Sequence, residues 1–222
     1  MQKYAVIVAG GMGKRMNNAT PKQFILLKGK PILYYTIDTF LKSFDDINII
    51  LVLPKDYIRE GEKIVSTFFT AKKITIIEGG ETRFHSVKNG LQYVQKNSIV
   101  FVHDGVRALV TQTLIHRCYN QAITIGTAIP NIACKDSTRL LTANSHQIID
   151  RNTVRLIQTP QTFQSNILLP AFKVDYAASF TDEASVVEAY GANIELIMGE
   201  ETNIKITTPI DLFIAEKILG DL

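Results

Sequence analysis

The sequence has little of what is typical of metalloproteins, exported proteins and membrane proteins. Its two cysteines, Cys118 and Cys134, lack CxxC spacing, and its four histidines show no metal-ligand spacing. No apolar run approaches the ~20 residues that a helix needs to cross a bilayer. The chain starts directly with a strand-like segment in place of a secretion signal. We therefore expect a cytoplasmic protein with reduced thiols, no structural zinc and no membrane partner.

The sequence also lacks a strong excess of charge. The formal net charge is +3, and the lysines and arginines are spread along the chain without a long basic run. No nucleic-acid partner is therefore expected, and a small anionic substrate is favoured. The chain of 222 residues is 46% hydrophobic, so it can bury a substantial core. We expect a single domain over residues 1–222.

Apolar, strand-like runs alternate with amphipathic, helix-like stretches. The expected strands are Tyr4–Ala9, Asn48–Leu53, Lys73–Ile77, Ser98–Val102, Gly126–Ile132 and Asn193–Met198. The expected helices are Pro31–Ser43, Thr82–Val94, Ser165–Phe172, Asp182–Tyr190 and Pro209–Leu219. This alternation predicts an α/β fold with a mostly parallel, twisted sheet and helices on both faces. The loops after the strands should converge on one ligand-binding crevice. Those loops start near Gly10, Gly79, Asp104 and Pro130.

One segment, at about residues 133–152, interrupts the alternation. Cys134–Leu141 and His146–Asp150 have the pattern of two short strands around a polar turn, which predicts a protruding β-hairpin arm. An isolated hairpin is marginally stable in water, so the arm should pack against something. The sequence does not distinguish two surfaces for this packing, namely a second copy of the chain and the arm's own domain.

A glycine-rich loop follows the first expected strand. It has the sequence AGGMGKRM from Ala9 to Met16, and PKQF follows at Pro21–Phe24. The glycines let backbone N–H groups approach a ligand, and the cations of the two motifs add positive charge, so the pattern suits a polyphosphate. It is neither a Walker loop nor a dinucleotide fingerprint, because Arg15 and Met16 stand where those motifs need other residues. The alternative is a βα turn with solvated basic residues.

Two charged residues are further candidates for a phosphate site. Asp104 ends an apolar strand at the same edge as the glycine loop, where a carboxylate could hold Mg²⁺ against phosphate oxygens. A helix cap or turn aspartate is the alternative. Lys205 lies between Ile204 and Ile206, so part of its stem should be buried and its ammonium aimed at a partner.

These residues are suited to one kind of reaction. A phosphomonoester is ionised at neutral pH and needs no general base to attack the α-phosphorus of a nucleoside triphosphate. Catalysis then consists of positioning and of charge neutralisation by arginine, lysine and Mg²⁺. The alternative of a different class is a nucleotide-binding protein without catalysis. Arg15, Lys22, Asp104 and Lys205 together argue against it.

Together the motifs resemble the 2-C-methyl-D-erythritol 4-phosphate cytidylyltransferases. The resemblance spans nearly the whole chain and rests on AGGMGKRM, PKQF, HDGVR, DRNTVRLIQTPQTF, TDEAS and NIKIT in this order. It implies a Rossmann-like nucleotidyltransferase fold. It also implies transfer of a cytidylyl group from CTP to 2-C-methyl-D-erythritol 4-phosphate, giving 4-diphosphocytidyl-2-C-methyl-D-erythritol and pyrophosphate for non-mevalonate isoprenoid synthesis.

The resemblance also implies roles for individual residues. Arg15 and Lys22 would stabilise the transition state on the CTP phosphates, and Arg151 and Lys205 would position the acceptor phosphate. The CTP and triphosphate pocket would comprise Ala9, Gly10, Gly11, Gly80, Glu81, Ser86 and Asp104, with Asp104 also close to Mg²⁺. The acceptor side would comprise Arg107, Ser137, Thr159 and Thr181. In the family the hairpin arm interlocks two subunits, which implies a homodimer whose arm delivers Ser137 and Arg151 to the neighbouring site.

The chain departs from the family pattern at two places. Gly105-Val106-Arg107-Ala108 stands where the family usually has two alanines, an arginine and a proline, and Gly-Val there is similar to ribitol-5-phosphate cytidylyltransferases. Ribitol 5-phosphate is therefore the alternative acceptor. The stretch Asn131–Lys135 is about two residues longer than usual, which leaves the equivalence of Ser137 open. Asp150–Phe163 and Thr181–Ser185 resemble the methylerythritol enzymes.

Overall fold

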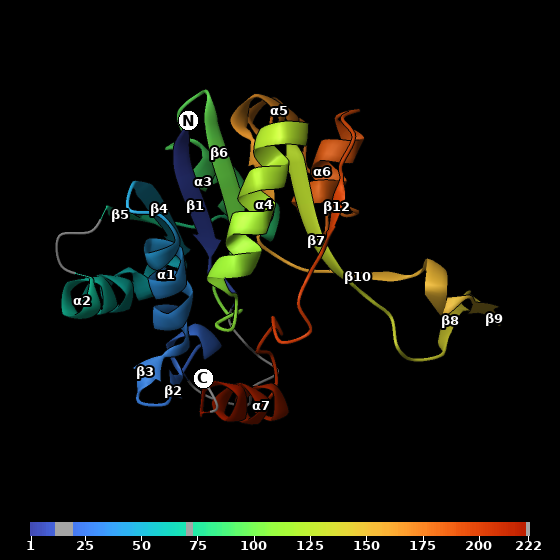
Figure 1. Cartoon of the computed structure of the whole chain (residues 1–222), viewed down its shortest axis with the longest axis horizontal. Helices are drawn as coiled ribbons and strands as arrows, with labels where there is room; N and C mark the ends of the chain where they lie inside the picture. The colour runs from blue at the N-terminus through green and yellow to red at the C-terminus, as the bar shows by residue number, and fades with distance from the viewer. Residues whose placement is uncertain (12–19, 70–72, 221–222) are drawn as a thin grey trace.

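An eight-stranded sheet forms the centre of the computed structural model, which describes residues 1–11, 20–69 and 73–220 (Figure 1). Its order is β10-β7-β11-β6-β1-β4-β5, with β12 paired to β7. The strands are β1 (Gln2–Val8), β4 (Ile47–Leu53), β5 (Ile74–Glu78), β6 (Ser98–Asp104), β7 (Thr127–Ala133), β10 (Arg155–Ile157), β11 (Gln161–Gln164) and β12 (Leu196–Met198). Strands β6, β1, β4 and β5 are parallel, whereas β11 runs antiparallel between β6 and β7. The predicted α/β architecture is confirmed.

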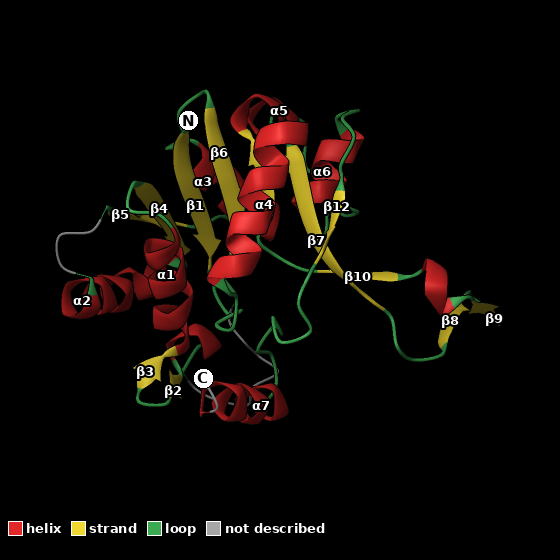
Figure 2. Ribbon diagram, viewed as in Figure 1, coloured by secondary structure: helices red, strands yellow, loops and turns green. Residues whose placement is uncertain are grey.

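Helices cover both faces of this sheet (Figure 2). They are α1 (Ile32–Ser43), α2 (Ile58–Phe68), α3 (Arg83–Leu91), α4 (Gln112–Ile125), α5 (Ser165–Ala171), α6 (Glu183–Ala189) and α7 (Pro209–Gly220). Side chains of α1, α2 and α4 pack in the core on one face, and side chains of α3, α5 and α6 pack in the core on the other. All the helices and strands expected from the sequence are present, with small shifts of their ends. Helices α2 and α4, strands β10 and β11, and the two-residue strands β2 (Leu26–Leu27) and β3 (Lys30–Pro31) had not been assigned.

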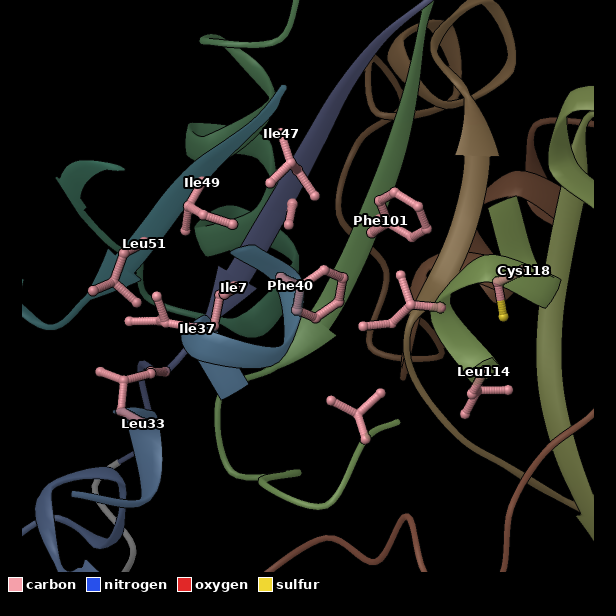
Figure 3. Close-up of a cluster of buried hydrophobic side chains, with 14 of the residues drawn as sticks. Ile7, Leu33, Ile37, Phe40, Ile47, Ile49, Leu51, Phe101, Leu114 and Cys118 are labelled. Atoms are coloured by element: carbon pink, nitrogen blue, oxygen red, sulfur yellow. The ribbon is translucent and has the colours of Figure 1, made fainter. Parts of the chain in front are cut away.

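Successive side chains of the central strands point to opposite faces of the sheet, so each strand contributes apolar residues to the core on either face. In β1, Ala5 and Ile7 face the first core, and Tyr4 and Val6 face the second. Figure 3 shows the first core, where Ile7 lies among Ile37, Phe40 and Phe101. A third cluster joins α7 to the start of α1 and to the short hairpin of β2 (Leu26–Leu27) and β3 (Lys30–Pro31). No helix in the described part of the chain combines the length and apolar character needed to cross a bilayer.

The parallel register brings the loops after three strands to one edge of the sheet. Val8 at the end of β1 is level with Val52 of β4 and with Asp104 of β6. Backbone hydrogen bonds hold the first loop residues at the same edge: Ala9 N donates to Val52 O at 2.9 Å, and Gly105 N donates to Val8 O at 2.9 Å. The expectation for Pro130 was wrong: it lies inside β7, which extends to Ala133 because its outer part pairs with β10 and β12.

The predicted hairpin is present and projects away from the sheet (Figure 1). It consists of β8 (Thr138–Leu141) and β9 (His146–Ile149), followed by the short 3-10 helix η4 (Arg151–Thr153). Thr142 N donates to Ser145 O at 2.9 Å and closes the turn. Apolar side chains of this hairpin face solvent, with Leu141 77% and Ile148 74% exposed.

Candidate active site

Two adjoining cavities lie at the carboxyl edge of the sheet. The first has a volume of about 280 Å³ and is bounded by the loop after β1, the start of α3 and Lys205. The second has a volume of about 220 Å³ and is bounded by the segment before β11 and the segment before α6. Arg83, Asp104 and Lys205 line both cavities, so they form the wall that the two spaces share.

The first cavity collects the residues expected on the CTP side. Its lining includes Ala9, Gly10, Gly11, Gly80, Glu81, Ser86 and Asp104, together with Lys22. The predicted Arg15 lies outside the described residues. Gln23 also lines this cavity, and the sequence interpretation had assigned it no role. It is 1% exposed and its Nε2 donates to Ala9 O at 2.7 Å, so it fixes the start of the glycine-rich loop.

The start of α3 forms the opposite side of this cavity. Thr82 caps the helix by accepting from His85 N at 3.3 Å, and Gly80 N donates to Ser86 Oγ at 3.1 Å. A Cβ at Gly80 would lie 2.4 Å from His85 Cβ, so only glycine fits without movement of the helix. The turn therefore presents its backbone directly to the cavity.

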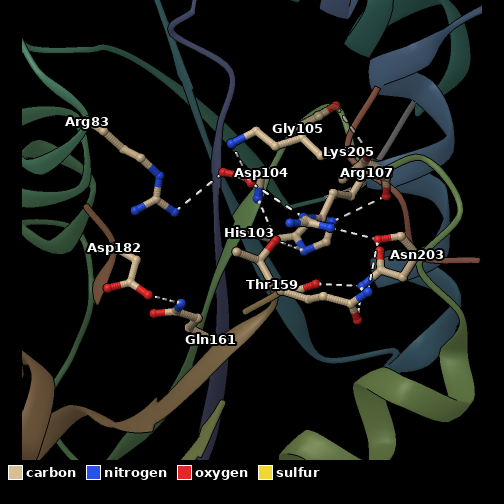
Figure 4. Close-up of polar contacts among 12 residues, drawn as sticks. Arg83, His103, Asp104, Gly105, Arg107, Thr159, Gln161, Asp182, Asn203 and Lys205 are labelled. Atoms are coloured by element: carbon tan, nitrogen blue, oxygen red, sulfur yellow. Dashed lines mark hydrogen bonds and ion pairs between the residues drawn. The ribbon is translucent and has the colours of Figure 1, made fainter. Parts of the chain in front are cut away.

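Asp104 faces three cations (Figure 4). Its Oδ2 lies 2.9 Å from Lys205 Nζ and 3.5 Å from Arg107 Nε, and its Oδ1 lies 3.4 Å from Arg83 Nη2. Burial alone would raise the pKa of this carboxyl, but the cations outweigh burial and hold the pKa well below its ordinary value. Asp104 is therefore ionised at neutral pH. The expectation that the Lys205 ammonium has a partner is confirmed.

The second cavity collects three of the expected acceptor-side residues, namely Arg107, Thr159 and Thr181. Thr159 Oγ1 accepts from Asp104 N at 3.1 Å, so the segment before β11 is attached to the end of β6. Arg107 Nη1 donates to Asn203 O at 2.7 Å, and Asn203 Nδ2 donates to Thr159 O at 2.8 Å. Asn203 is fully buried. It belongs to the NIKIT motif, but nothing in the sequence indicated that it holds two acceptor-side residues in place.

His103 is a packing residue in the core. It is fully buried, and its ring centroid lies 5.2 Å from that of Phe40. Burial lowers the pKa of His103 to about 3, so the ring is neutral. Its Nε2 lies 3.4 Å from Arg107 O and its Nδ1 lies 3.0 Å from Thr159 Oγ1. In the tautomer that satisfies both contacts, Nε2–H donates to the carbonyl and Nδ1 accepts from the threonine hydroxyl.

Arg83 and Glu183 form an ion pair that the sequence interpretation missed. Arg83 Nη1 donates to Glu183 Oε1, and Arg83 Nη2 donates to Glu183 Oε2 at 3.0 Å. The two residues are 100 positions apart, and Glu183 also has a local explanation as an acidic residue in the first turn of a helix. Burial raises the pKa of Glu183 even though the Arg83 charge opposes this effect.

Ser137 and Arg151 lie elsewhere in this chain. Both line a separate hollow of about 340 Å³ on the arm, together with Thr138, Ile148 and Asp150. Arg151 Nη1 donates to Lys135 O at 2.8 Å. Within one chain, the structure therefore does not bring these two residues to the cavities that contain Asp104.

Few side chains near the two cavities could act as ligands for a divalent cation. In the described part of the chain, no three or more histidine, cysteine, aspartate or glutamate side chains are grouped so that they could hold a metal ion. Asp104 supplies a carboxylate to both cavities, beside backbone N–H groups and lysines. Mg²⁺ is commonly held by one or two carboxylates together with substrate phosphates. The residues present fit Mg²⁺ bound in that way.

Comparison with known proteins gives consistent results. The family model for 2-C-methyl-D-erythritol 4-phosphate cytidylyltransferase matches residues 4–221. The chain is 44% identical over 219 residues to the enzyme of that name from Phocaeicola vulgatus, with 99% of this chain and 100% of the relative covered. It is 46% identical to the enzyme of the same name from Azobacteroides pseudotrichonymphae, with coverages of 98% and 99%.

Solved structures agree with these matches. The 4-diphosphocytidyl-2C-methyl-D-erythritol synthase of Anaerococcus prevotii superposes with a TM-score of 0.84 at 27% identity, covering 99% of this chain and 96% of the other. The 2-C-methyl-D-erythritol 4-phosphate cytidylyltransferase of Francisella tularensis superposes with a TM-score of 0.81 at 30% identity, covering 98% and 99%. The likeness therefore extends over the complete sheet and its helices.

Proposed function

Because the chain belongs to the 2-C-methyl-D-erythritol 4-phosphate cytidylyltransferase family, we propose that it transfers a cytidylyl group from CTP to 2-C-methyl-D-erythritol 4-phosphate. The products are 4-diphosphocytidyl-2-C-methyl-D-erythritol, an isoprenoid precursor, and pyrophosphate. The observation that carries the proposal is the pair of cavities with a shared wall of Arg83, Asp104 and Lys205. A donor in one cavity and an acceptor in the other would meet at that wall.

CTP is proposed to occupy the first cavity. Gly10 and Gly11, which follow Ala9, would bring backbone N–H groups to the triphosphate, while the turn at Gly80 and Glu81 with Ser86 would hold the cytidine. Lys22 lines the same space, and with Arg15 it would neutralise the charge that develops on the transferring group. The contacts of Ser86 and Gly80 leave this turn preorganised.

The acceptor phosphate is proposed to enter the second cavity. Arg107, Thr159 and Thr181 line it, and Lys205 at the shared wall would orient the phosphate toward CTP. An oxygen of that phosphate forms the new bond to the α-phosphorus of CTP. The bond from the α-phosphorus to its bridging oxygen breaks, and pyrophosphate leaves with the electron pair. No general base is needed, because the acceptor is already ionised.

Mg²⁺ is the proposed cofactor. Asp104 would hold it together with oxygens of the CTP phosphates, and the ionised state of this carboxyl favours that role. When bound, the ion supplies neutralisation of the triphosphate charge. Lys205, 2.9 Å from the same carboxylate, would limit how the carboxylate can turn.

A homodimer is proposed to complete the site. The hairpin has exposed apolar side chains at Leu140, Leu141 and Ile148, and a hairpin of this size needs a surface to pack against. Ser137 and Arg151 lie on the same arm, away from the cavities of their own chain. Packing of each arm on the other subunit would bury the apolar residues and bring the two polar residues to the partner's acceptor cavity. The enzyme is proposed to act in the cytoplasm, without nucleic-acid or membrane partners.

Ribitol 5-phosphate is not favoured as the acceptor. The family model and the relatives described above are all named for methylerythritol. Gly105, which had suggested ribitol, has a packing explanation: a Cβ there would lie 2.8 Å from Ala9 Cβ and 3.2 Å from Leu33 Cδ1. The glycine therefore reflects close packing of the loop against β1 and α1.

The test is pyrophosphate release with CTP and each alcohol phosphate at matched concentrations. We expect turnover with methylerythritol phosphate to exceed turnover with ribitol 5-phosphate. Faster turnover with ribitol 5-phosphate would overturn the acceptor assignment. CTP binding without turnover on either acceptor would favour a nucleotide-binding protein instead.

A further inference from the structure

The ion pair of Arg83 and Glu183 joins the two halves of the site. Arg83 is the first residue of α3, directly after the turn with Gly80 and Glu81 on the CTP side. Glu183 is the first residue of α6, two positions after Thr181 on the acceptor side. Each oxygen of the Glu183 carboxylate accepts from a different guanidinium nitrogen, which fixes the plane of the guanidinium as well as its distance.

Glu183 is the fixed member of the pair. It is 1% exposed, and the start of α6 is attached to the sheet by Gln161 of β11. Gln161 Oε1 accepts from Ala184 N at 2.8 Å, and Gln161 Nε2 donates to Asp182 Oδ2 at 2.8 Å. Asp182 Oδ1 in turn accepts from Ser185 N at 2.9 Å and caps the helix. Glu183 therefore has little freedom, whereas Arg83 reaches it through a long side chain.

Arg83 is shared between Glu183 and Asp104. Its Nη2 lies 3.0 Å from Glu183 Oε2 but 3.4 Å from Asp104 Oδ1. Lys205 is closer to the same Asp104 carboxylate, at 2.9 Å from Oδ2. The Arg83 guanidinium thus faces Asp104 Oδ1, and its hydrogen bonds to Glu183 prevent a shorter contact with that oxygen. Without the Glu183 charge, the guanidinium would be free to move onto Asp104.

We propose that Glu183 and Arg83 form a positioning pair for the transfer reaction. Glu183 fixes the guanidinium of Arg83, and the guanidinium sets the orientation of Asp104 at the wall between the two cavities. In this role Arg83 acts by positioning Asp104, and Glu183 acts only through Arg83. This inference rests on the proposed function, since it assigns the pair a role in that reaction.

The test is a double-mutant cycle of Arg83→Met and Glu183→Gln, measured as steady-state pyrophosphate release. Each single variant is expected to lower kcat at least about tenfold, with KM for either substrate changed less than about threefold, because orientation and not binding is lost. The double variant is expected to match Arg83→Met within about twofold, because no arginine remains for Glu183 to hold. Arg59→Met and Glu62→Gln, both at exposed positions of α2, are the matched controls and should retain wild-type kcat.

Thermal unfolding of the same proteins gives a second measurement. Arg83→Met leaves the buried Glu183 charge without a partner and should lower the melting temperature. Adding Glu183→Gln should recover part of that loss. Arg83→Lys, which keeps the charge but not the two-point contact, should have a kcat between those of wild type and Arg83→Met.

The outcomes separate this inference from the proposed function. If the loss of kcat in the double variant equals the product of the two single losses, the positioning pair is overturned. The proposed function is untouched by that result as long as the wild-type protein turns over. Wild-type kcat in Glu183→Gln would also overturn it, even if Arg83→Met failed to fold. Absence of wild-type turnover with either acceptor would overturn the proposed function, and the pair with it.

Discussion

The ammonium nitrogen of Lys205 lies 2.9 Å from Oδ2 of Asp104, at the wall that the two cavities share. The lysine side chain is 42% exposed, whereas the aspartate side chain is 10% exposed. Lys205 is thus the more accessible member, and it can exchange a contact with Asp104 for one with a bound phosphate.

Replacement of Lys205 by methionine should lower kcat/KM for the acceptor by about 100-fold, because an ionic contact to phosphate and the restraint on Asp104 are both lost. The measurement is initial-rate pyrophosphate release at varied acceptor concentration. Lys173→Met, at an exposed position, is the control for the loss of a surface charge. Retention of at least half of wild-type kcat/KM in Lys205→Met would contradict the assigned role.

Lys22→Ala should affect the rate much more than the binding of CTP. A cation that acts on charge developing in the transition state contributes little to ground-state affinity, so kcat should fall about 100-fold or more while the Kd for CTP changes less than about fivefold. Calorimetry with CTP and steady-state kinetics give the two values. Lys55→Ala is the exposed control. Equal losses in kcat and affinity would make Lys22 a binding residue only.

Arg151→Ala should inactivate the site of the partner subunit and not its own. Mixed dimers of Arg151→Ala with Lys205→Met should therefore regain activity, since one of the two sites then contains both intact residues. Mixing is expected to restore about a quarter of wild-type activity when subunits exchange at random and each variant is inactive alone. The control is a mixture of Lys22→Ala with Lys205→Met, because both residues line the first cavity of one chain. Absence of recovery in the first mixture would argue against a shared site.

His103 should make stability depend on pH. Its pKa is lowered to about 3 in the folded protein, against about 6.5 in the unfolded chain, so the unfolded state binds a proton first. The stability due to the neutral ring is present above pH ~6.5 and is lost as the pH falls from there toward about 3. His103 contributes at most about 1.4 kcal/mol per pH unit to the slope of the free energy of unfolding against pH.

The measurement is the free energy of unfolding from urea titrations between pH 7 and pH 5. His103→Gln, which keeps a donor and an acceptor, should flatten this pH dependence, whereas the exposed His146→Gln should not. An unchanged slope in His103→Gln would show that other groups dominate. The ionised state of Asp104 should not change in this range, because its pKa lies well below it.

The sequence predicted those parts of the molecule that depend on local patterns. Strand β6 and helix α3 were predictable in this way, because the periodicity of their apolar residues is local. The crevice residues Gly10 and Asp104 were predictable because parallel strands end at one edge. Strand β11 was not, because its antiparallel insertion between β6 and β7 depends on pairing between distant segments.

The residues that the sequence interpretation missed act through distant partners. Glu183 has a sufficient local explanation at the start of a helix, and its contact with Arg83 exists only in the folded chain. Gln23 and Asn203 likewise hold backbone carbonyls of other segments, at Ala9 and Thr159. Pro130 was misplaced for a related reason: the end of β7 is set by pairing with β10 and β12, which periodicity within β7 does not encode.

The measurement that tests the central claim most directly is the identity and stoichiometry of the products formed from CTP and 2-C-methyl-D-erythritol 4-phosphate. Phosphorus NMR of a reaction with magnesium should show 4-diphosphocytidyl-2-C-methyl-D-erythritol and pyrophosphate rising together in equal amounts, and neither forming when the acceptor is omitted. Consumption of CTP that does not depend on the acceptor, or pyrophosphate without the cytidylyl product, would contradict the account.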